Sequence, residues 1–588
     1  MCGIVGYAGE GRAAPVLIEG LKRLEYRGYD SAGIAVLGET LTVVRRKGRV
    51  EALAAEAEKL SGRLGIAHTR WATHGEPSER NAHPHRYGGV AVVHNGIIEN
   101  AALLRAECEA RGEVFSSETD SEVIAHLIAA AYRGDLLQAV QKAARQLEGS
   151  YAIAVLAEGE RVIVAARRKS PLLVGRGEGS VLASDLPAIA PLANEVYSLK
   201  EGGFALLTEG QVCLFDEELR EWEEKPIAFG KVEGDGGKGG YPHYMRKEIA
   251  EDPAAIANSI ADLTADSRFF DISIVLCQTY YIQIVACGTA YHSGVAAKYA
   301  IEALSRVPVE VDIASEYRYR DPIVPKGTLV IAVSQSGETA DTLAAAALAK
   351  ERGAKVLALT NVPYSSLTAL ADFVLLTHAG RETAVAATKS FCAQLASLYS
   401  LAASLAALKG RSAPSLVPFP ALCEDALSRS QKVKVWARVL CQKKSVYFIG
   451  RGADYAAAIE GSLKLKEVSY LASEGYPAGE LKHGTLALVG EDAPVVALLS
   501  DARLAEKTMN AVHEVRSRGA RVFLITTLPS CAEGVLPEED VLLLSACEAV
   551  FSPLCTVVPL QLLAYETAVL LGHDPDKPRN LAKSVTVE

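Results

Sequence analysis

IQIVACGTAYHSGVAAKYAIE (282–302) and LVIAVSQSGETADTLAAAALAKERGAKVLALT (329–360) form a pattern that returns later in the chain. The second copy reads VYFIGRGADYAAAIEGSLKLKE (446–467) and APVVALLSDARLAEKTMNAVHEVRSRGARVFLIT (493–526). Each copy has a strand-like run, a Gly-x-x-Tyr turn, a helical run, a strand-like run ending in a serine turn, a helical run, Arg-Gly-Ala and a strand-like run. Alternating strands and helices predict a parallel sheet covered on both faces. The repeat therefore predicts two α/β domains in tandem.

Glycines fix the spacing of the two copies. Gly288 aligns with Gly452 and Gly353 aligns with Gly519, at offsets of 164 and 166 residues. We expect the two domains over 273–412 and 438–578, followed by a C-terminal tail over 579–588. Ligands of such sheets bind at the carboxyl ends of the strands.

The first part of the chain has a different organisation. Over 2–228, short strand-like runs alternate with helical stretches near 51–60 and 121–131, which indicates a strand-rich α+β domain. Six of the eleven residues in 230–240 are glycine, too flexible and polar a composition for a core. We therefore place a linker over 229–245.

Composition limits the function classes. The 588 residues suffice for three or four domains, and a net charge of −10 opposes binding to nucleic acid or to an anionic membrane. Eleven cysteines without a CxxC pair fit reduced thiols, and the start MCGIVGYAGEGR lacks a signal-peptide pattern. The longest apolar stretch, near 395–410, is too short and too rich in serine to span a bilayer. We expect a cytoplasmic protein without membrane contact.

The loop Ser334-Gln-Ser-Gly-Glu-Thr339 follows a strand and opens a helix. Its hydroxyls and backbone N–H groups would converge at a helix N-terminus, which favours phosphate. The alternative is an ordinary serine-rich turn with helix-capping residues. The second copy has Ser500-Asp501 at this place, where a carboxylate would repel an anion, so we expect phosphate binding in the first copy only.

Charged residues of the second copy suggest proton transfer. Glu460, Lys464 and Glu467 are spaced i, i+4 and i+7, which puts them on one helical face. His483 lies in a loop between Gly479 and Gly484, where an imidazole could reach a ligand as an acid or base. The alternatives are a solvated charged helix and a histidine that only stabilises its loop.

Cys2 stands directly behind the initiator methionine. Removal of Met1 would give one residue both a thiol and an α-amine, and the amine could accept the thiol proton near neutral pH. The alternative is a small residue that merely permits removal of the methionine.

Polar residues between 68 and 120 could serve that nucleophile. Arg70 could hold a carboxylate beside Trp71, Asp120 could hold an ammonium group, and the amide of Asn95 with the N–H of Gly96 could form an oxyanion hole. A metal site is disfavoured, because the spacings match no zinc pattern although five histidines lie close in sequence: His68, His74, His83, His85 and His94.

With these strings and the ending NLAKSVTVE, the chain closely resembles the glutamine-fructose-6-phosphate aminotransferase (isomerising) family, also called glucosamine-6-phosphate synthases, over essentially its whole length. The resemblance implies an N-terminal-nucleophile (Ntn) hydrolase domain of αββα layers, followed by two tandem α/β sugar isomerase (SIS) domains. It implies glutamine-dependent conversion of fructose 6-phosphate to glucosamine 6-phosphate, the first step of hexosamine and UDP-N-acetylglucosamine biosynthesis. It implies no cofactor or metal, and at least a homodimer in which His483 serves the neighbouring subunit.

The resemblance also implies residue roles. Cys2 attacks the glutamine side-chain amide, ammonia passes through a channel gated by Trp71, Lys583 forms a Schiff base with the sugar and Glu467 moves its proton. The implied catalytic residues are Cys2, Asn95, Gly96, Glu467, His483 and Lys583. The implied glutamine-binding residues are Arg70, Trp71, Thr73, His74, His83 and Asp120. The implied phosphosugar-binding residues are Thr289, Ser334, Gln335, Ser336, Thr339, Val385, Glu460 and Lys464.

Three positions depart from the family pattern. Ala290 and Ala387 stand where serine is common, and Thr485 stands where proline usually follows the His-Gly pair. The departures leave a second hypothesis, an amidotransferase that acts on another phosphosugar. A third hypothesis is a phosphosugar sensor without activity, against which the combination of Lys583, Glu467 and His483 argues. The apolar stretch 261–283 has no explanation from sequence.

Overall fold

The computed structural model describes residues 2–72, 74–227, 237–265, 268–532, 534 and 536–586. Of the predicted linker, residues 229–236 lie outside the described part. The chain divides into two compact units, Met1–Gly236 with Ser584–Glu588, and Gly237–Lys583.

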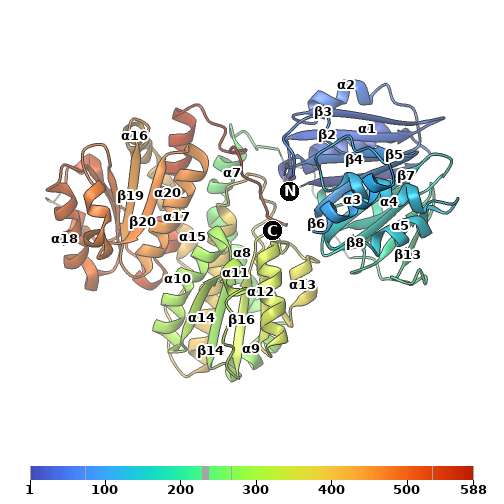
Figure 1. Ribbon diagram of the computed structural model, residues 1–588. Coiled ribbons are helices and arrows are strands. Elements are labelled where there is room, and N and C mark those ends of the chain that lie inside the picture. Colours follow the sequence, from blue (N-terminus) through green and yellow to red (C-terminus); the bar gives the residue numbers. More distant parts are fainter. Residues whose placement is uncertain are drawn as a thin grey trace. The chain divides into compact units, whose positions relative to one another are not determined.

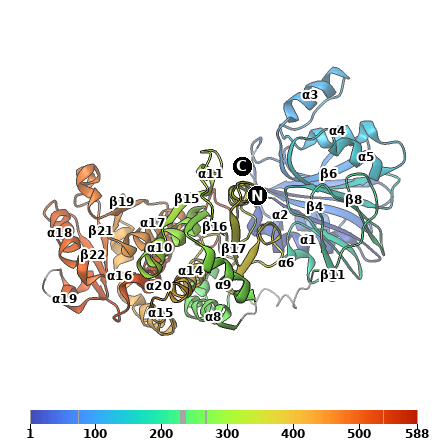
Figure 2. The same cartoon turned by 90° about the horizontal axis from the view of Figure 1, so that it is seen from below.

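The first unit consists of two antiparallel sheets in face-to-face layers (Figures 1 and 2). The seven-stranded sheet has the order β11-β9-β10-β1-β4-β2-β3 and the six-stranded sheet has the order β13-β12-β8-β7-β6-β5. Their strands are β1 (Gly3–Gly9), β2 (Ser31–Leu37), β3 (Leu41–Lys47), β4 (Leu64–Arg70), β5 (His85–Tyr87), β6 (Val90–Ile98), β7 (Gly149–Ala157), β8 (Ile163–Arg168), β9 (Leu173–Gly177), β10 (Gly179–Ala183), β11 (Ala193–Ser198), β12 (Phe204–Leu207) and β13 (Val212–Phe215).

Helices cover the outer face of each sheet, which completes the predicted αββα layers (Figure 2). The seven-stranded sheet carries α1 (Ala13–Leu24), α2 (Glu51–Ala57) and α6 (Leu186–Ile189), and the six-stranded sheet carries α4 (Glu122–Ala131) and α5 (Leu136–Ala144), with α3 (Ala101–Ala110) against α4. The expectation of only two helical stretches was therefore incomplete. The helices that were missed are α1, α3, α5 and α6, and length is not the reason, since α1 is longer than either of the two that were predicted.

The second unit contains the two predicted parallel sheets, each flanked by helices (Figure 1). The sheet orders are β15-β14-β16-β17-β18 and β20-β19-β21-β22-β23, so the sequence repeat is also a repeat of topology. The strands of the first copy are β14 (Tyr281–Ala286), β15 (Val309–Ile313), β16 (Thr328–Val333), β17 (Lys355–Thr360) and β18 (Phe373–Leu376). Those of the second are β19 (Ser445–Gly450), β20 (Ala472–Pro477), β21 (Val495–Leu499), β22 (Val522–Thr526) and β23 (Val541–Leu543).

Many helices of the second unit pack into one core that joins both copies, and the others cover the opposite face of the sheet in their own copy. Before and within the first copy they are α7 (Tyr244–Ala250), α8 (Asp252–Ala265), α9 (Arg268–Gln278), α10 (Gly288–Ser305), α11 (Ala314–Tyr317), α12 (Ala340–Glu351), α13 (Ser366–Leu370) and α14 (Lys389–Leu408). From there on they are α15 (Phe419–Ser428), α16 (Ser430–Leu440), α17 (Ala453–Ser469), α18 (Ala505–Arg516), α19 (Pro529–Ala532) and α20 (Pro553–Leu570). Short 3₁₀ helices include η2 (Glu480–His483) and η3 (Thr485–Leu488).

Two of these helices are long and apolar enough to cross a membrane by composition alone. The apolar windows of α14 and α20 are, however, 78% and 83% buried inside the unit. The apolar composition of both helices is accounted for by the shared core, since a buried helix is hydrophobic all round.

The apolar stretch 261–283 is the end of α8, the helix α9 and the start of β14. Ile272, Val275 and Leu276 are buried in the core, and α9 packs against α14. The stretch is apolar because α9 adds a further covering helix to the first parallel sheet.

The helices α17 and α20 pack closely against each other in the shared core, and Gly461 allows this approach. A Cβ atom at Gly461 would lie 2.7 Å from Cδ1 and 3.0 Å from Cβ of Leu560. The two backbones can therefore approach only because position 461 has no side chain.

We predict that Gly461→Val lowers the free energy of unfolding by about 2 kcal/mol, because the extra methyl groups overpack this contact. Lys466→Val on the exposed face of the same helix is the control, and its β-branched side chain should cost less than about 0.7 kcal/mol. Urea unfolding of both variants gives the comparison. Equal losses would show that helix propensity, not packing, dominates.

Candidate active sites

The first candidate site begins at Cys2, which leads into β1 of the first unit. Its Sγ lies 3.4 Å from the backbone N and 3.6 Å from the backbone O of Trp71. The Cys2 carbonyl accepts hydrogen bonds from Arg27 Nε and from Asn95 Nδ2, both at 3.1 Å. The thiol is thus held where β1, β4 and β6 meet.

A small pocket opens beside this thiol. Its lining is Cys2, Arg70, Trp71, His83, His94, Gly96, Thr119, Asp120 and Ser121. The structure thereby brings together six of the residues that the resemblance implied for glutamine chemistry, and Asn95 contacts Cys2 from the same strand as Gly96. Thr73 lies outside the described residues, and His74 is exposed in the loop after β4.

The pocket contains one buried cation and one carboxylate. Arg70 ends β4 and donates to the carbonyls of His74, Gly75 and Glu76, the last two at 3.1 and 3.5 Å. Burial lowers the pKa of Arg70, and the negative charges of Cys2, Asp30 and Asp120 partly offset this. Asp120 Oδ2 accepts the N–H of Ile98 at 2.8 Å. A guanidinium and a carboxylate in one pocket suit the two charges of an amino acid.

Gly96 is a glycine for steric reasons. Its φ of +137° is unfavourable for other residues, and a Cβ atom would lie 2.0 Å from the carbonyl oxygen of Ser150. The backbone of β6 can therefore pass the pocket only with glycine at this position.

His68, whose contribution sequence reasoning missed, fixes the side chain of Asn95. Its Nε2 lies 2.9 Å from the carbonyl oxygen of His94 and 3.1 Å from Asn95 Oδ1. Since the carbonyl can only accept, Nε2 carries the proton, and Oδ1 is the acceptor atom of the Asn95 amide. The NH₂ group of Asn95 is thereby turned toward Cys2. No signal in the sequence links residue 68 to residue 95.

Burial holds His68, His83 and His85 of this unit in the neutral form. Burial lowers the pKa of His68 to about 3 and that of His85 to about 3, and it places the pKa of His83 well below its usual value. His68 and His83 stack with ring centroids 4.2 Å apart. Among the residues that the structure describes, no three His, Cys, Asp or Glu side chains are grouped to hold a metal ion.

These histidines should make the first unit acid-sensitive. The unfolded chain takes up a proton at His85 below about pH 6.5, whereas the folded chain does so only near pH 3, so stability falls as the pH drops through this window. We predict that His85→Gln reduces the loss of unfolding free energy between pH 7 and pH 5 by about 2 kcal/mol. Urea titrations at both pH values, followed by hydrogen exchange in β5 and β6, measure this loss. His513→Gln on the exposed face of α18 should leave it unchanged.

The second candidate site is the loop after β16, at the carboxyl edge of the first parallel sheet. Ser334 Oγ contacts Thr339 Oγ1 at 3.0 Å and accepts the N–H of Gly337 at 3.1 Å, and Ser336 Oγ accepts the N–H of Glu338 at 3.1 Å. Gly337 has φ +67°, and a Cβ atom there would lie 2.0 Å from Ser365 Oγ. The loop wraps the first turn of α12, whose N–H groups have no partner inside the helix.

The corresponding loop of the second copy is filled by the chain itself. Asp454 Oδ2 accepts the N–H of Ser500 at 2.7 Å, and its Oδ1 accepts from Ser552 Oγ at 3.2 Å. Burial raises the pKa of Asp454 to about 6. The first copy has Ala290 at the position of Asp454 and so has no carboxylate there. This adds a structural reason for anion binding in the first copy only.

The predicted helical face of α17 is buried, not solvated. Lys464 is 1% exposed and pairs with Glu467 at 2.6 Å and with Glu460 at 3.5 Å. Glu460 crosses to the first copy, where it accepts from Thr289 Oγ1 at 3.1 Å and contacts His292 Nδ1 at 2.8 Å. The structure thus places Thr289, Glu460, Lys464 and Glu467 in one cluster that both copies form.

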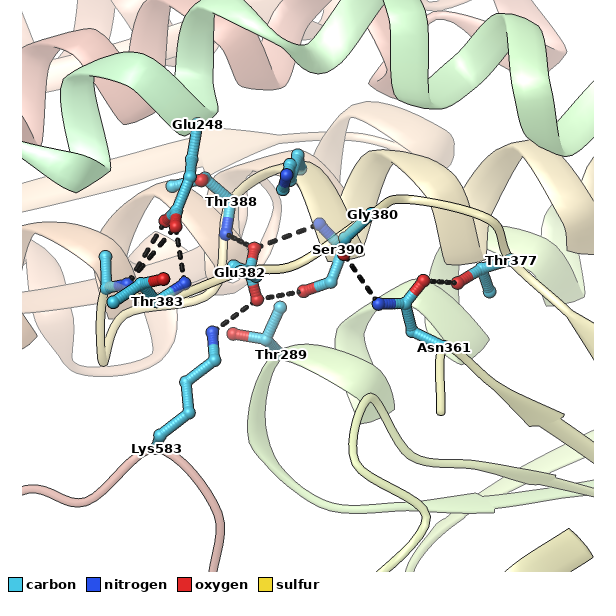
Figure 3. A network of polar contacts seen from close by, with 12 residues as sticks. Glu248, Thr289, Asn361, Thr377, Gly380, Glu382, Thr383, Thr388, Ser390 and Lys583 are labelled. Atoms are coloured by element: carbon cyan, nitrogen blue, oxygen red, sulfur yellow. Dashed lines mark hydrogen bonds and ion pairs between the residues drawn. The ribbon is translucent and has the colours of Figure 1, made fainter. Parts of the chain in front are cut away.

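Lys583 of the C-terminal tail enters the same region (Figure 3). Its ammonium pairs with Oε2 of Glu382, a residue of the loop that precedes α14. Thr289 of α10 lies close to this pair. Sequence reasoning missed Glu382, because the string RETAVAATKS carries no recognisable carboxylate motif. Val385, further along the same loop, is buried and donates its N–H to the carbonyl of Asp576 at 3.0 Å.

His483 is not joined to this cluster by a contact. It lies exposed at the end of η2, and among the described residues no hydrogen bond or ion pair involves its side chain. Gly484 behind it has φ +156° and ψ −60°, and Thr485 begins η3.

Comparisons with known proteins cover both units. Residues 68–191 match the model of a glutamine amidotransferase domain, and residues 276–404 and 439–571 match the model of a SIS domain. The glutamine–fructose-6-phosphate aminotransferase [isomerizing] of Clostridium tetani is 47% identical over 609 residues, with 100% of both chains covered. The chain belongs to this aminotransferase family. The relatives of the same name from Thermus thermophilus and Shigella flexneri are 46% and 44% identical, again with 100% of both chains covered.

A solved structure agrees with this membership of the aminotransferase family. The C-terminal domain of glucosamine-fructose-6-phosphate aminotransferase from Francisella tularensis is 39% identical, with a TM-score of 0.56, and the match covers 58% of this chain and 100% of that one. The predicted fold class, an amidotransferase domain followed by two SIS domains, is confirmed.

Proposed function

We propose that this member of the family makes glucosamine 6-phosphate from fructose 6-phosphate and glutamine. The proposal is supported by a thiol pocket with charges that suit an amino acid in the first unit, and by a hydroxyl-rich loop at a helix N-terminus and buried lysine–carboxylate pairs in the second. The alternative acceptor, another phosphosugar, is the second candidate, since Ala290 and Ala387 stand where serine is common in the family.

In the first reaction, Cys2 Sγ attacks the amide carbon of glutamine after its α-amine has accepted the thiol proton. The oxyanion receives hydrogen bonds from Asn95 Nδ2, which His68 orients, and from the N–H of Gly96. Arg70 and Asp120 hold the carboxylate and ammonium of the substrate, with Thr73, His74 and His83 around them. Ammonia leaves, and water hydrolyses the thioester to glutamate.

In the second reaction, the phosphate of fructose 6-phosphate lies on Ser334, Gln335, Ser336 and Thr339. His483 helps to open the ring, and Lys583 forms an imine with the ketone carbon C2. Ammonia that has passed Trp71 displaces the lysine, and Glu467 moves a proton from C1 to C2. The sum consumes one fructose 6-phosphate and one ammonia and releases one glucosamine 6-phosphate and one water.

The same proposal includes the protein's assembly and surroundings. His483 is exposed on a short 3₁₀ helix, where a second copy of the chain could receive it, so we propose a homodimer. The acidic composition and the burial of both long apolar helices suit a cytoplasmic enzyme that acts on small anionic substrates.

Cys2→Ala should abolish amino-sugar formation with glutamine and leave formation with ammonium within about twofold, because only the first site loses its nucleophile. Mass spectrometry of the products from fructose 6-phosphate measures both. Cys213→Ala, a thiol outside the pocket, is the control and should leave both reactions intact. Full glutamine-dependent activity in chains that retain Met1 would contradict the role of the α-amine.

Lys583→Ala should lower synthesis with either nitrogen source by about 100-fold or more, while glutamine hydrolysis persists, because the imine cannot form. Fructose 6-phosphate binding, followed by calorimetry, should remain. Synthesis at the wild-type rate with bound phosphosugar would exclude the assigned role of Lys583. Glutamate without any amino sugar, in the wild-type protein, would instead favour the other acceptor.

A further inference from the structure

Glu382 is held by hydrogen bonds at the N-terminus of α14 (Figure 3). Its Oε1 accepts the N–H groups of Thr388 and Ser390 at 2.9 and 3.0 Å, and its Oε2 accepts the hydroxyl of Ser390 at 2.7 Å. These three donors come from one helix end and do not depend on Lys583. The carboxylate is therefore placed by the scaffold, and the tail lysine docks onto it.

The ion pair with Lys583 is buried on both sides. The side chains of Lys583 and Glu382 are 4% and 0% exposed. Two charges are rarely taken out of water for stability alone, because the desolvation cost competes with their attraction. A buried pair inside a reaction site is better explained by a charge that the chemistry needs there.

Of the three buried carboxyl groups in this region, Glu248, Asp252 and Glu382, only Glu382 has a lowered pKa. Glu248 of α7 accepts the N–H groups of Thr383 and Ala384 from the other side of the loop, and burial followed by the charge of Glu382 raises its pKa to about 7. Burial also raises the pKa of Asp252 of α8 well above its usual value. Burial acts on Glu382 in the same direction, but the charge and hydrogen bond of Lys583 outweigh it and lower its pKa to about 2.

We propose that Glu382 is the positioning residue and permanent counter-ion of Lys583: it docks the lysine at the phosphosugar site and then neutralises the iminium that this lysine forms with the sugar. The inference rests on the proposed imine role of Lys583.

The positive charge on the nitrogen of Lys583 persists through the proposed reaction, so a counter-ion that is always charged suits it. The C2 ketone and the Lys583 ammonium condense to an iminium, and the carbonyl oxygen leaves as water with two of the three N–H protons. One positive charge is present before and after this step, and Glu382 faces it throughout. When ammonia attacks the iminium carbon and the lysine departs, the original ion pair forms again.

Glu382→Gln tests the charge with little change of shape. The amide oxygen can still accept from the lysine, but the iminium would then be a buried positive charge without a negatively charged partner. We expect kcat with ammonium to fall by about 100-fold or more with KM for fructose 6-phosphate within about threefold. Borohydride trapping should give correspondingly less adduct on Lys583. Glu382→Asp, which keeps the charge, should recover at least tenfold of the lost kcat and most of the adduct.

The matched control is Asp540→Asn, which removes the charge of another buried carboxylate that pairs with Arg521 at 2.7 Å. It should leave kcat and trapping unchanged. The inference is overturned if Glu382→Gln traps the adduct as the wild type does, or if Glu382→Asp is no better than Glu382→Gln. Absence of any adduct on Lys583 in the wild type would instead refute the imine role, and with it the proposed function on which the inference rests.

Discussion

The contact on which the second unit depends most is that of Glu460 with the first copy. This carboxylate is fully buried on α17, and burial is tolerable only because Lys464, Thr289 and His292 surround it with a charge and two donors. Two of these partners belong to the other α/β copy. The polar cluster of Thr289, Glu460, Lys464 and Glu467 therefore exists only when both copies are docked.

The two copies show how one topology gives unequal sites. Their sheets have the same strand order, and both place a serine turn at the carboxyl edge. The turns differ in sequence, and in the second copy Asp454, which stands where the first copy has Ala290, accepts the N–H of Ser500. In the first copy the N–H of Ser334 donates to the carbonyl of Leu359, and the hydroxyls of the turn contact one another.

Much of this arrangement could be predicted from the sequence, because it depends on local pattern. The period of the repeat predicted the parallel sheets, and SQSGET predicted a loop at a helix N-terminus. Both features depend on residues that are close to one another in the sequence. The helices α1 and α3 were missed because neither begins with a capping side chain that would mark its start, and α5 was missed although Asp135 caps it. The roles of Glu382 and His68 were missed because their partners, Lys583 and Asn95, are 201 and 27 residues away, and pairings at such separations leave no local trace. Of the site residues implied by family resemblance, six line the thiol pocket and four form the cluster between the two copies, whereas His74 and His483 stand apart and Thr73 lies outside the described part.

In the second copy, Asp454 bonds to the turn at Ser500, and this affects which of the two copies can bind a ligand at its turn. Because Asp454 bonds to this turn at the carboxyl edge of the sheet, we do not expect the second copy to bind the phosphosugar there. Its helix α17 instead contributes Glu460, Lys464 and Glu467 to the cluster shared with the first copy. In the reaction proposed above, one copy would hold the phosphosugar and the other would supply charged side chains, so neither copy would be active alone.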